Sequence, residues 1–222
     1  MQIALLGGTG DIGEGLALRL AHDTNHDVIV GSRKAEKAET TAEEYETELS
    51  SRGVDVTVGH AENPEAAAGA DVVVLSVPAY HLADTVESVA DRLDEGAVLV
   101  SPAVGMKRDD DGVHYNPPGP GSVTQLAAGA APEDVSVVGA YHNLAAGRLA
   151  DLDADLGWDV PVVGDDADAV DLVMAVTRGV EGLRPIRAGG LANAAEVESL
   201  TPLLINLAAN NADRHDLGVR FQ

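Results

Sequence analysis

Cysteine is absent from this chain of 222 residues. Without a thiol the protein can form no disulfide bond, carry no thiolate nucleophile and hold no iron–sulfur cluster through cysteine ligands. No apolar run reaches the ~18 residues that a membrane-spanning helix needs, and no signal peptide precedes the first apolar run, at residue 3. We therefore expect a soluble protein of the cytoplasm.

Basic side chains are scarce. Fourteen lysines and arginines face 37 acidic residues, which gives a formal charge of −23. The acids are spread over many segments rather than collected in one tail, so the chain does not resemble a disordered one. Such a surface disfavours nucleic acids and anionic membranes as partners. It is typical of a salt-rich cytoplasm, where molar salt screens charges beyond about 3 Å, and it indicates a halophilic source.

A glycine-rich stretch follows the first apolar run. Residues 7–13 read GGTGDIG and lie between the apolar residues 3–6 and an apolar pattern of helical period. Gly8, Gly10 and Gly13 match G-x-G-x-x-G, in which the glycines in turn permit a tight turn, close approach to a pyrophosphate, and close packing of helix on strand. Amide groups at the helix start can hold phosphates. The context predicts a dinucleotide site.

The end of the second predicted strand indicates which dinucleotide binds. In NAD-binding units a carboxylate about 20 residues further on binds the ribose hydroxyls. Here residues 28–30 lead into GSRKAEK, and no carboxylate stands at the strand end. Arg33 and Lys37, four residues apart on one helix face, can surround a phosphate, and Ser32 can donate a further hydrogen bond. These residues favour NADP over NAD.

Strand and helix patterns alternate from residue 1 to about 140, which predicts an α/β fold with a Rossmann-type, doubly wound parallel sheet. Glycine and proline exclude regular structure from residues 105–121, so we expect a long functional or mobile loop there. Besides the two strands already described, we expect strands at 54–58, 71–78, 97–102 and 135–140, and helices from 35–52, from residue 63, at 83–93 and at 122–128.

The remainder predicts a smaller α/β unit. We therefore divide the chain into a nucleotide-binding Rossmann domain, residues 1–150, and a small C-terminal domain, residues 151–222, that completes the cleft. Strands at 160–164 and 183–187 flank a helix at 166–178, and a last helix spans 193–211. Thr201 and Pro202 interrupt that helix, either as a kink or as the N-cap and first residue of a new helix.

Candidate acid/base groups are few. Dehydrogenases of this plan commonly use a lysine or a histidine, but Lys107 is the only lysine after residue 37. His142 follows the sixth predicted strand and so faces the cleft, while His81, His114 and His215 lie elsewhere. Whether His142 is structural or functional stays open. The shortage suits a second substrate that accepts a hydride directly, such as a redox cofactor.

Several stretches distributed over nearly the whole chain match motifs of one known family. They are MQIALLGGTGDIGEGLALRLA, VIVGSRKAEKAE, VVVLSVP, WDVPVVGDD, GLRP, VESLTPLLINL and the tail DLGVRF. Together they resemble the archaeal NADPH-dependent F420 reductases, also called F420:NADP oxidoreductases, and so suggest a haloarchaeal protein. The resemblance implies direct, reversible hydride transfer between NADP(H) and the deazaflavin coenzyme F420, in a Rossmann domain with a small C-terminal domain, commonly as a homodimer.

The resemblance also implies roles for individual residues, and no metal site. His142, Ser199 and Thr201 would position F420 without acting as acids or bases. The cofactor contacts implied are Gly8, Thr9, Gly10, Asp11, Ile12 and Gly13 at the pyrophosphate loop, Ser32, Arg33 and Lys37 at the 2′-phosphate, Val77, Val104 and Ala146 at the nicotinamide, and Leu217 at the deazaflavin.

Three positions depart from the family pattern. Ala79 stands where relatives often carry an aromatic residue, Ala145 near a usual proline, and Ala195 at a usual basic residue. These changes affect the expected recognition of F420 rather than of NADP. Two alternatives stay open: an NADPH-dependent reductase of an imine, a flavin or ferric iron, and a non-catalytic NADP-sensing module. The lack of a membrane-spanning run disfavours a ferric reductase, and the family motifs, tail included, disfavour a sensor.

Overall fold

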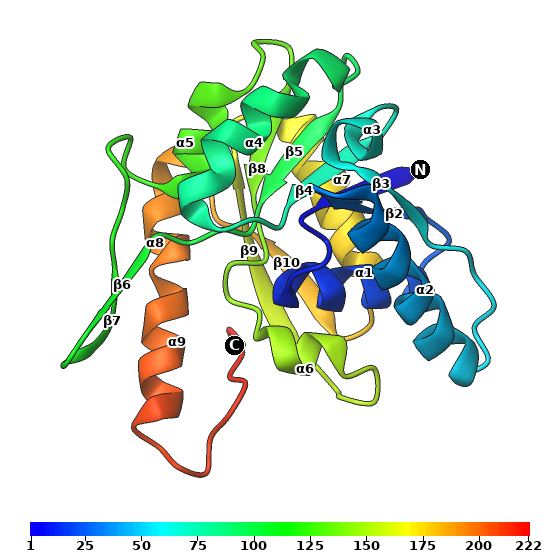
Figure 1. The fold of residues 1–222 in the computed structure, drawn as a ribbon. Helices are drawn as coiled ribbons and strands as arrows, with labels where there is room; N and C mark the ends of the chain where they lie inside the picture. The colour runs from blue at the N-terminus through cyan, green and yellow to red at the C-terminus, as the bar shows by residue number, and fades with distance from the viewer.

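The computed structural model, which describes residues 1–222, contains an eight-stranded sheet covered by helices on both faces (Figure 1). The predicted α/β, Rossmann-type fold is confirmed. In spatial order the strands are β10 (Leu183–Arg187), β9 (Trp158–Gly164), β8 (Ser136–Gly139), β5 (Val98–Ser101), β4 (Val72–Leu75), β1 (Gln2–Leu6), β2 (Asp27–Ser32) and β3 (Gly59–Glu62). The last six strands in this order, from β8 across to β3, are parallel and follow the Rossmann order, with the direction of winding reversing between β1 and β4.

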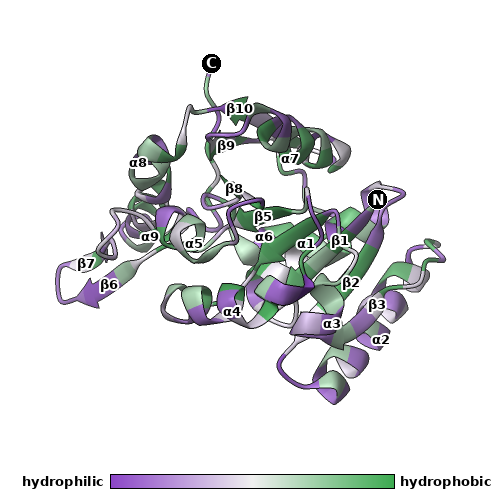
Figure 2. Cartoon of the chain, turned by 90° about the horizontal axis from the view of Figure 1, so that it is seen from above, coloured by the Kyte–Doolittle hydropathy of each residue, from purple (hydrophilic) through white to green (hydrophobic).

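Both faces of the sheet are buried because side chains alternate along each strand. Ile3 and Leu5 of β1 join one apolar core, and Ala4 and Leu6 join the other. Figure 2 shows this as hydrophobic colour along the central strands. The first core is covered by α1 (Asp11–Asp23), α2 (Ala35–Ser51), α6 (Ala146–Ala150) and α7 (Ala167–Gly179), and the second by α3 (Asn63–Ala67), α4 (Leu82–Val89) and α5 (Val123–Ala130).

The remaining elements are short or lie beside the sheet. A separate hairpin of β6 (Met106–Asp109) and β7 (Gly112–Tyr115) packs beside the C-terminal helix (Figure 1). That helix is split into α8 (Ala194–Glu198) and α9 (Leu200–Ala209), and short 3-10 turns are η1 (Ala79–His81), η2 (Ala90–Arg92) and η3 (Leu191–Asn193). None of the helices combines the length and the apolar character needed to cross a lipid bilayer.

Two predictions of secondary structure are wrong. The third strand is Gly59–Glu62, which pairs with β2, and not residues 54–58. Val54 and Val56 pack against the first core without joining the sheet, so their alternation reflects burial rather than strand pairing. Residues 105–121 contain the β6–β7 hairpin and not only a loop. Gly112 (φ +131°) follows the turn at Asp110 and Asp111 as the first residue of β7, and the prolines come after β7.

The break in the last helix lies two residues earlier than predicted. Ser199 separates α8 from α9, and Pro202 falls in the first turn of α9, where a proline costs no helical hydrogen bond. The chain therefore starts a new helix, as one of the two alternatives proposed, but Ser199 rather than Thr201 occupies the cap position.

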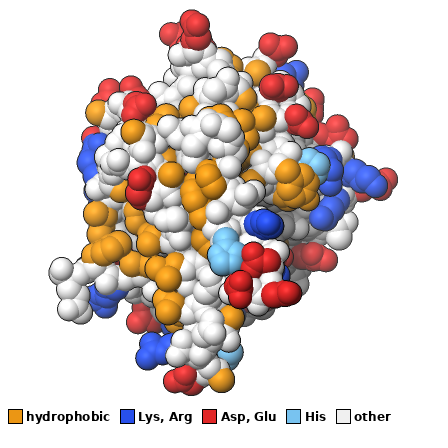
Figure 3. All heavy atoms as spheres, turned by 90° about the vertical axis from the view of Figure 1, so that its left-hand side faces the viewer, with side chains coloured by type: hydrophobic (Ala, Val, Ile, Leu, Met, Phe, Trp, Pro, Cys, Tyr) orange, Lys and Arg blue, Asp and Glu red, His pale blue; other side chains and the backbone are white.

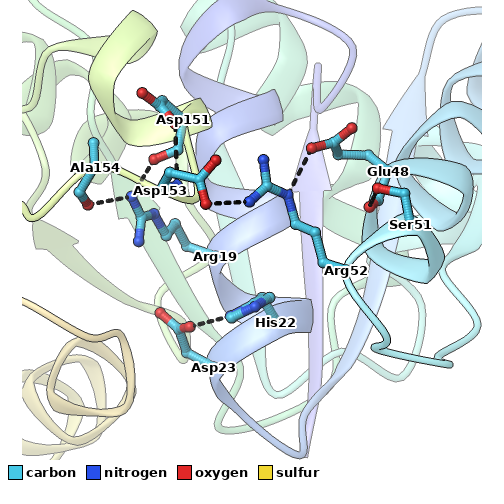
Figure 4. Close-up of polar contacts among 9 residues, drawn as sticks. All are labelled: Arg19, His22, Asp23, Glu48, Ser51, Arg52, Asp151, Asp153 and Ala154. Atoms are coloured by element: carbon cyan, nitrogen blue, oxygen red, sulfur yellow. Dashed lines mark hydrogen bonds and ion pairs between the residues drawn. The ribbon is translucent and has the colours of Figure 1, made fainter.

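The segment after α6 is fastened to the nucleotide-binding half (Figure 4). Arg19 of α1 is buried and donates to the carbonyl oxygens of Leu149 (3.0 Å), Asp151 (2.5 Å) and Ala154 (2.9 Å). Arg52 at the end of α2 binds Asp153 at 2.6 Å. Strands β9 and β10 also extend the same sheet beyond β8, so the sheet runs through the expected boundary near residue 150, and the division into two domains stays a prediction.

Candidate active site

The glycine loop crosses from β1 to α1 with almost no free space around its backbone. Gly7, rather than the predicted Gly8, makes the turn: its φ is +76°, and a Cβ there would lie 2.6 Å from the carbonyl oxygen of Ser76. A Cβ on Gly13 would lie 2.6 Å from Gly8 Cα, so that glycine lets α1 approach the loop. The buried Tyr45 hydroxyl donates to the Gly8 carbonyl at 2.8 Å, a support that no sequence motif indicated.

A cavity of about 730 Å³ opens beside this loop, at the carboxyl ends of β1, β2 and β4. We call it the glycine-loop cavity. It lies where the winding of the sheet reverses, the usual ligand position in such folds. Gly8 and Gly13 are buried beneath it, and Asp11 and Ile12 lie in the first turn of α1 without lining it. The predicted residues that do line it are Thr9, Gly10, Ser32, Arg33, Lys37 and Val77.

Four polar side chains of this cavity lack partners within the chain. Arg33 and Lys37 are exposed and take part in none of the ion pairs of the structure. Asn63 Oδ1 and Ser76 Oγ are buried and accept or donate no hydrogen bond. Buried polar atoms are nearly always hydrogen-bonded, and cations at a helix start gain from an anion. The cavity therefore fits a ligand that is both anionic and rich in hydrogen-bonding groups, as NADP is.

A second cavity, of about 310 Å³, has mostly apolar walls. We call it the His142 cavity. It is formed by the segment after β8, the start of α6, one face of α9 and the C-terminal tail, and it brings together four predicted residues: His142, Ala146, Thr201 and Leu217. Ser199 does not line it, because its hydroxyl donates to the Glu196 carbonyl at 2.7 Å. The role of Ser199 therefore stays a prediction.

His142 is held at both its backbone and its ring. The Thr201 hydroxyl donates to its carbonyl oxygen at 2.6 Å, and its Nε2 lies 3.3 Å from Thr124 Oγ1. Burial lowers the pKa of His142 to about 3, because an imidazolium would lose its hydration there. The ring is therefore neutral at physiological pH and brings no charge to the cavity.

The three residues predicted to line the nicotinamide follow three neighbouring parallel strands. Val77 follows β4, Val104 follows β5 and Ala146 follows β8. Val77 lines the glycine-loop cavity, Ala146 lines the His142 cavity, and Val104 lines neither. Since the carboxyl ends of parallel strands share one edge of the sheet, both cavities border this edge.

Several residues of the site escaped the sequence analysis. Tyr80 lines the glycine-loop cavity, and its ring centroid lies 4.3 Å from that of His81. Tyr80 directly follows Ala79, so the aromatic residue that relatives often carry at position 79 is present here one position later. Glu198 is fully buried, which the sequence analysis did not predict. Its place inside the mostly apolar stretch VESLTPLL is the signal that could have suggested a buried carboxylate. No group of three or more acidic or histidine side chains is arranged to hold a metal ion.

The tail is anchored by another buried carboxylate. Asp159 of β9 accepts hydrogen bonds from Arg184 and from the backbone N–H of Phe221. This places Leu217 in the wall of the His142 cavity. Nothing in the sequence pattern connected Asp159 with the tail.

Comparison with known proteins identifies a family. The family model described as "NADP oxidoreductase coenzyme F420-dependent" matches residues 2–105. Two curated proteins named F420-dependent NADP reductase are similar over nearly their whole length. That of Methanocaldococcus jannaschii is 38% identical over 209 residues, which cover 93% of this chain and 92% of the relative. That of Methanothermobacter thermautotrophicus is 39% identical over 224 residues, covering 100% and 94%.

Solved structures share the fold. A chain from Arthrobacter sp. FB24, described as a candidate F420-dependent NADP reductase, superposes with a TM-score of 0.79 at 23% identity and covers 100% of this chain and 99% of its own. A pyrroline-5-carboxylate reductase from Coxiella burnetii reaches 0.60 at 18% identity, covering 94% and 67%. At these identities the likeness concerns the fold alone.

Proposed function

Because this chain belongs to the family of F420-dependent NADP reductases, we propose a division of labour between its two cavities. The enzyme is an oxidoreductase that transfers a hydride between NADP(H) and coenzyme F420. In our proposal the glycine-loop cavity holds NADP(H), the His142 cavity holds the deazaflavin, and the two rings meet at the shared edge of the sheet. The observation that carries this proposal is that both cavities border one edge of the sheet, with Val77 in the wall of the first and Ala146 in the wall of the second.

At the glycine-loop cavity the chain supplies charge and backbone amides. Arg33 and Lys37 pair with the 2′-phosphate and Ser32 donates to it, while Thr9 and the amides at the start of α1 hold the pyrophosphate. This assignment is supported by the two cations that form no ion pair and by the side chains of Asn63 and Ser76, which have no hydrogen-bond partner. NADH lacks the phosphate, so we expect these cations to select for NADPH.

At the His142 cavity the chain supplies an apolar wall and a few polar groups. Leu217 of the tail and Ala146 contact the flat deazaflavin, while His142 and Thr201 position its polar edge. A hydride carries both electrons and one hydrogen from C4 of the nicotinamide to C5 of the deazaflavin. Water supplies the proton that completes the reduced deazaflavin, so no protein acid or base has to act in the hydride step. The protein contributes alignment of the two rings and exclusion of water, which are large terms in catalysis between bound reactants.

The direct test is to mix the purified protein with NADPH and oxidised F420 in molar KCl and to follow the deazaflavin absorbance. We expect fast bleaching with NADPH and slow bleaching with NADH. A protein that binds NADPH but does not bleach F420 would contradict the assignment of the second cavity. Equal rates with both nicotinamides would contradict the assignment of Arg33 and Lys37.

The proposal includes a homodimer formed through α9 and the β6–β7 hairpin. Only Pro202 of α9 is buried, whereas Leu203 and Leu207 are about half exposed, as is Met106 of the hairpin. Figure 3 shows hydrophobic side chains gathered on the side of the molecule that carries both elements. Light scattering tests this: Leu203→Glu together with Leu207→Glu should yield monomers, and an unchanged mass would exclude this face.

The remaining parts of the proposal concern the surroundings of the enzyme. The charge of −23 supports a halophilic, cytoplasmic protein that binds no nucleic acid. We expect activity and stability to rise between low salt and molar KCl, because salt screens repulsion between the acidic surface and two anionic substrates. A salt optimum below physiological ionic strength would contradict this.

A further inference from the structure

Glu198 is a buried carboxylate that has no cationic partner. It is 0% exposed, and none of the ion pairs of the structure includes it. Four hydrogen bonds replace water: the amides of Val123 (3.0 Å) and Thr124 (2.9 Å) and the hydroxyls of Thr124 and Tyr115 (both 2.9 Å) donate to it. The two amides open α5, so the helix dipole also favours the negative charge. Glu198 is therefore held rigidly between the hairpin, α5 and the α8–α9 junction.

The hydrogen bonds of Thr124 determine which ring nitrogen of His142 carries the hydrogen. A hydroxyl has one hydrogen, and Thr124 donates it to Glu198, since a carboxylate can only accept. Towards His142 Nε2, at 3.3 Å, the same oxygen must therefore accept. Because burial keeps the imidazole neutral, with a lowered pKa, a hydrogen on Nε2 leaves Nδ1 bare. Nδ1 of His142 is itself buried and has no hydrogen-bond partner in the protein.

The backbone of His142 is constrained as well. The preceding residue, Tyr141, has a φ of +69°, which is rare for a residue with a side chain, and its buried hydroxyl lies 2.9 Å from Thr177 Oγ1. Thr201, three residues after Glu198, donates to the His142 carbonyl. Backbone strain of this kind is found preferentially where a side chain must be presented in one orientation. The α8–α9 junction thus controls both the ring, through Glu198 and Thr124, and the main chain, through Thr201.

We infer that Glu198 and Thr124 are positioning residues for the reaction: they fix His142 as the Nε2–H tautomer and hold its ring in one orientation at the wall of the His142 cavity. The inference rests on the proposed function for the identity of the ligand in that cavity, F420.

The tautomer is tested without any ligand by nitrogen-15 NMR of the histidine side chains, with His142→Asn to assign the signal. In the wild-type protein we expect the pattern of a neutral ring protonated at Nε2. Thr124→Val, which keeps the shape and removes the hydroxyl, should produce a mixture of tautomers, and Thr124→Ser should restore the Nε2–H form. A wild-type ring protonated at Nδ1, or an unchanged tautomer in Thr124→Val, would overturn the inference.

Steady-state kinetics then test the consequence for the reaction. Thr124→Val and Glu198→Gln should raise the KM for F420 roughly 10-fold, the cost of losing one hydrogen bond that fixes the His142 ring, and leave the KM for NADPH unchanged. Thr124→Ser should recover most of the loss. Should Glu198→Gln fail to fold, Thr124→Val and Thr124→Ser suffice. If the His142 ring is protonated at Nε2 but the protein does not bind F420, the proposed function is contradicted and the positioning of His142 is not.

Discussion

The two cavities differ in how their residues are supplied by the chain. The glycine-loop cavity is built mostly from the turns directly after β1, β2 and β4, and its polar groups, among them two exposed cations, lie close to recognisable motifs. The His142 cavity combines the segment after β8 with α9 and the tail, which are more than 50 residues further along the chain. The first binds through charge and backbone, the second through apolar shape and a buried hydrogen-bond network. The first should therefore tolerate changes at a distance, whereas the second depends on contacts between remote segments.

The largest effect is expected from Gly13→Ala. A methyl group 2.6 Å from Gly8 Cα must push α1 away from the loop, which costs about 1–3 kcal/mol of stability and roughly 100-fold in affinity for NADPH. Calorimetric titration and thermal unfolding measure both. Gly129→Ala in α5 is the matched control, because no atom lies within 4 Å of its Cβ; it should stabilise the protein by about 0.5–1 kcal/mol. Normal NADPH binding by Gly13→Ala would disprove the close approach.

Next in size is the loss of phosphate recognition. Changing Arg33 and Lys37 to glutamine removes two charged hydrogen-bond donors, and each should raise the KM for NADPH roughly 10- to 100-fold while the KM for NADH and for F420 stays the same. Lys107→Gln on the hairpin removes the same charge from the protein and serves as the control. If NADPH and NADH are affected equally, these side chains do not recognise the 2′-phosphate.

A third prediction concerns acid. The pKa of His142 is lowered from its ordinary value near 6.5 to about 3, so below pH 6.5 the unfolded chain binds a proton that the folded chain refuses. Its contribution to stability is present above pH 6.5 and is lost as the pH falls, by about 1.4 kcal/mol per unit. Between pH 6.5 and 5 the free energy of unfolding, measured with a denaturant, should therefore fall by about 2 kcal/mol less in His142→Gln than in wild type. His60→Gln, at an exposed position, should behave like wild type. Identical pH slopes would show that His142 is not buried neutral.

The smallest effect is expected in the tail. Leu217→Ala removes apolar contact from the His142 cavity and should raise the KM for F420 roughly 5- to 10-fold without changing the KM for NADPH. Phe221→Ala is the control, since the backbone N–H that binds Asp159 remains. An increase in the KM for NADPH alone would place the nicotinamide, rather than the deazaflavin, against the tail.

The errors of the sequence analysis have local causes. Residues 54–58 alternate because Val54 and Val56 cover the core, yet a strand also requires a neighbour to pair with, and only Gly59–Glu62 reaches β2. The hairpin at Met106–Tyr115 was predicted to be a loop because Gly112 was counted as a breaker, although it is the first residue of β7 and pairs with Asp109. The helix break was found but misplaced by two residues, since a proline is tolerated in a first turn.

What the sequence determined by itself is the nucleotide half: the Rossmann fold, the glycine loop, and the grouping of Ser32, Arg33 and Lys37 at the end of one strand. These features depend on local periodicity and on the fact that parallel strands end at one edge. Only the tertiary structure decided that Glu198 reaches His142 through Thr124, that Tyr45 supports Gly8, and that Asp159 anchors the tail. Each of these hydrogen bonds joins segments distant in the chain, and spacing along a sequence carries no information about which distant polar groups are buried together.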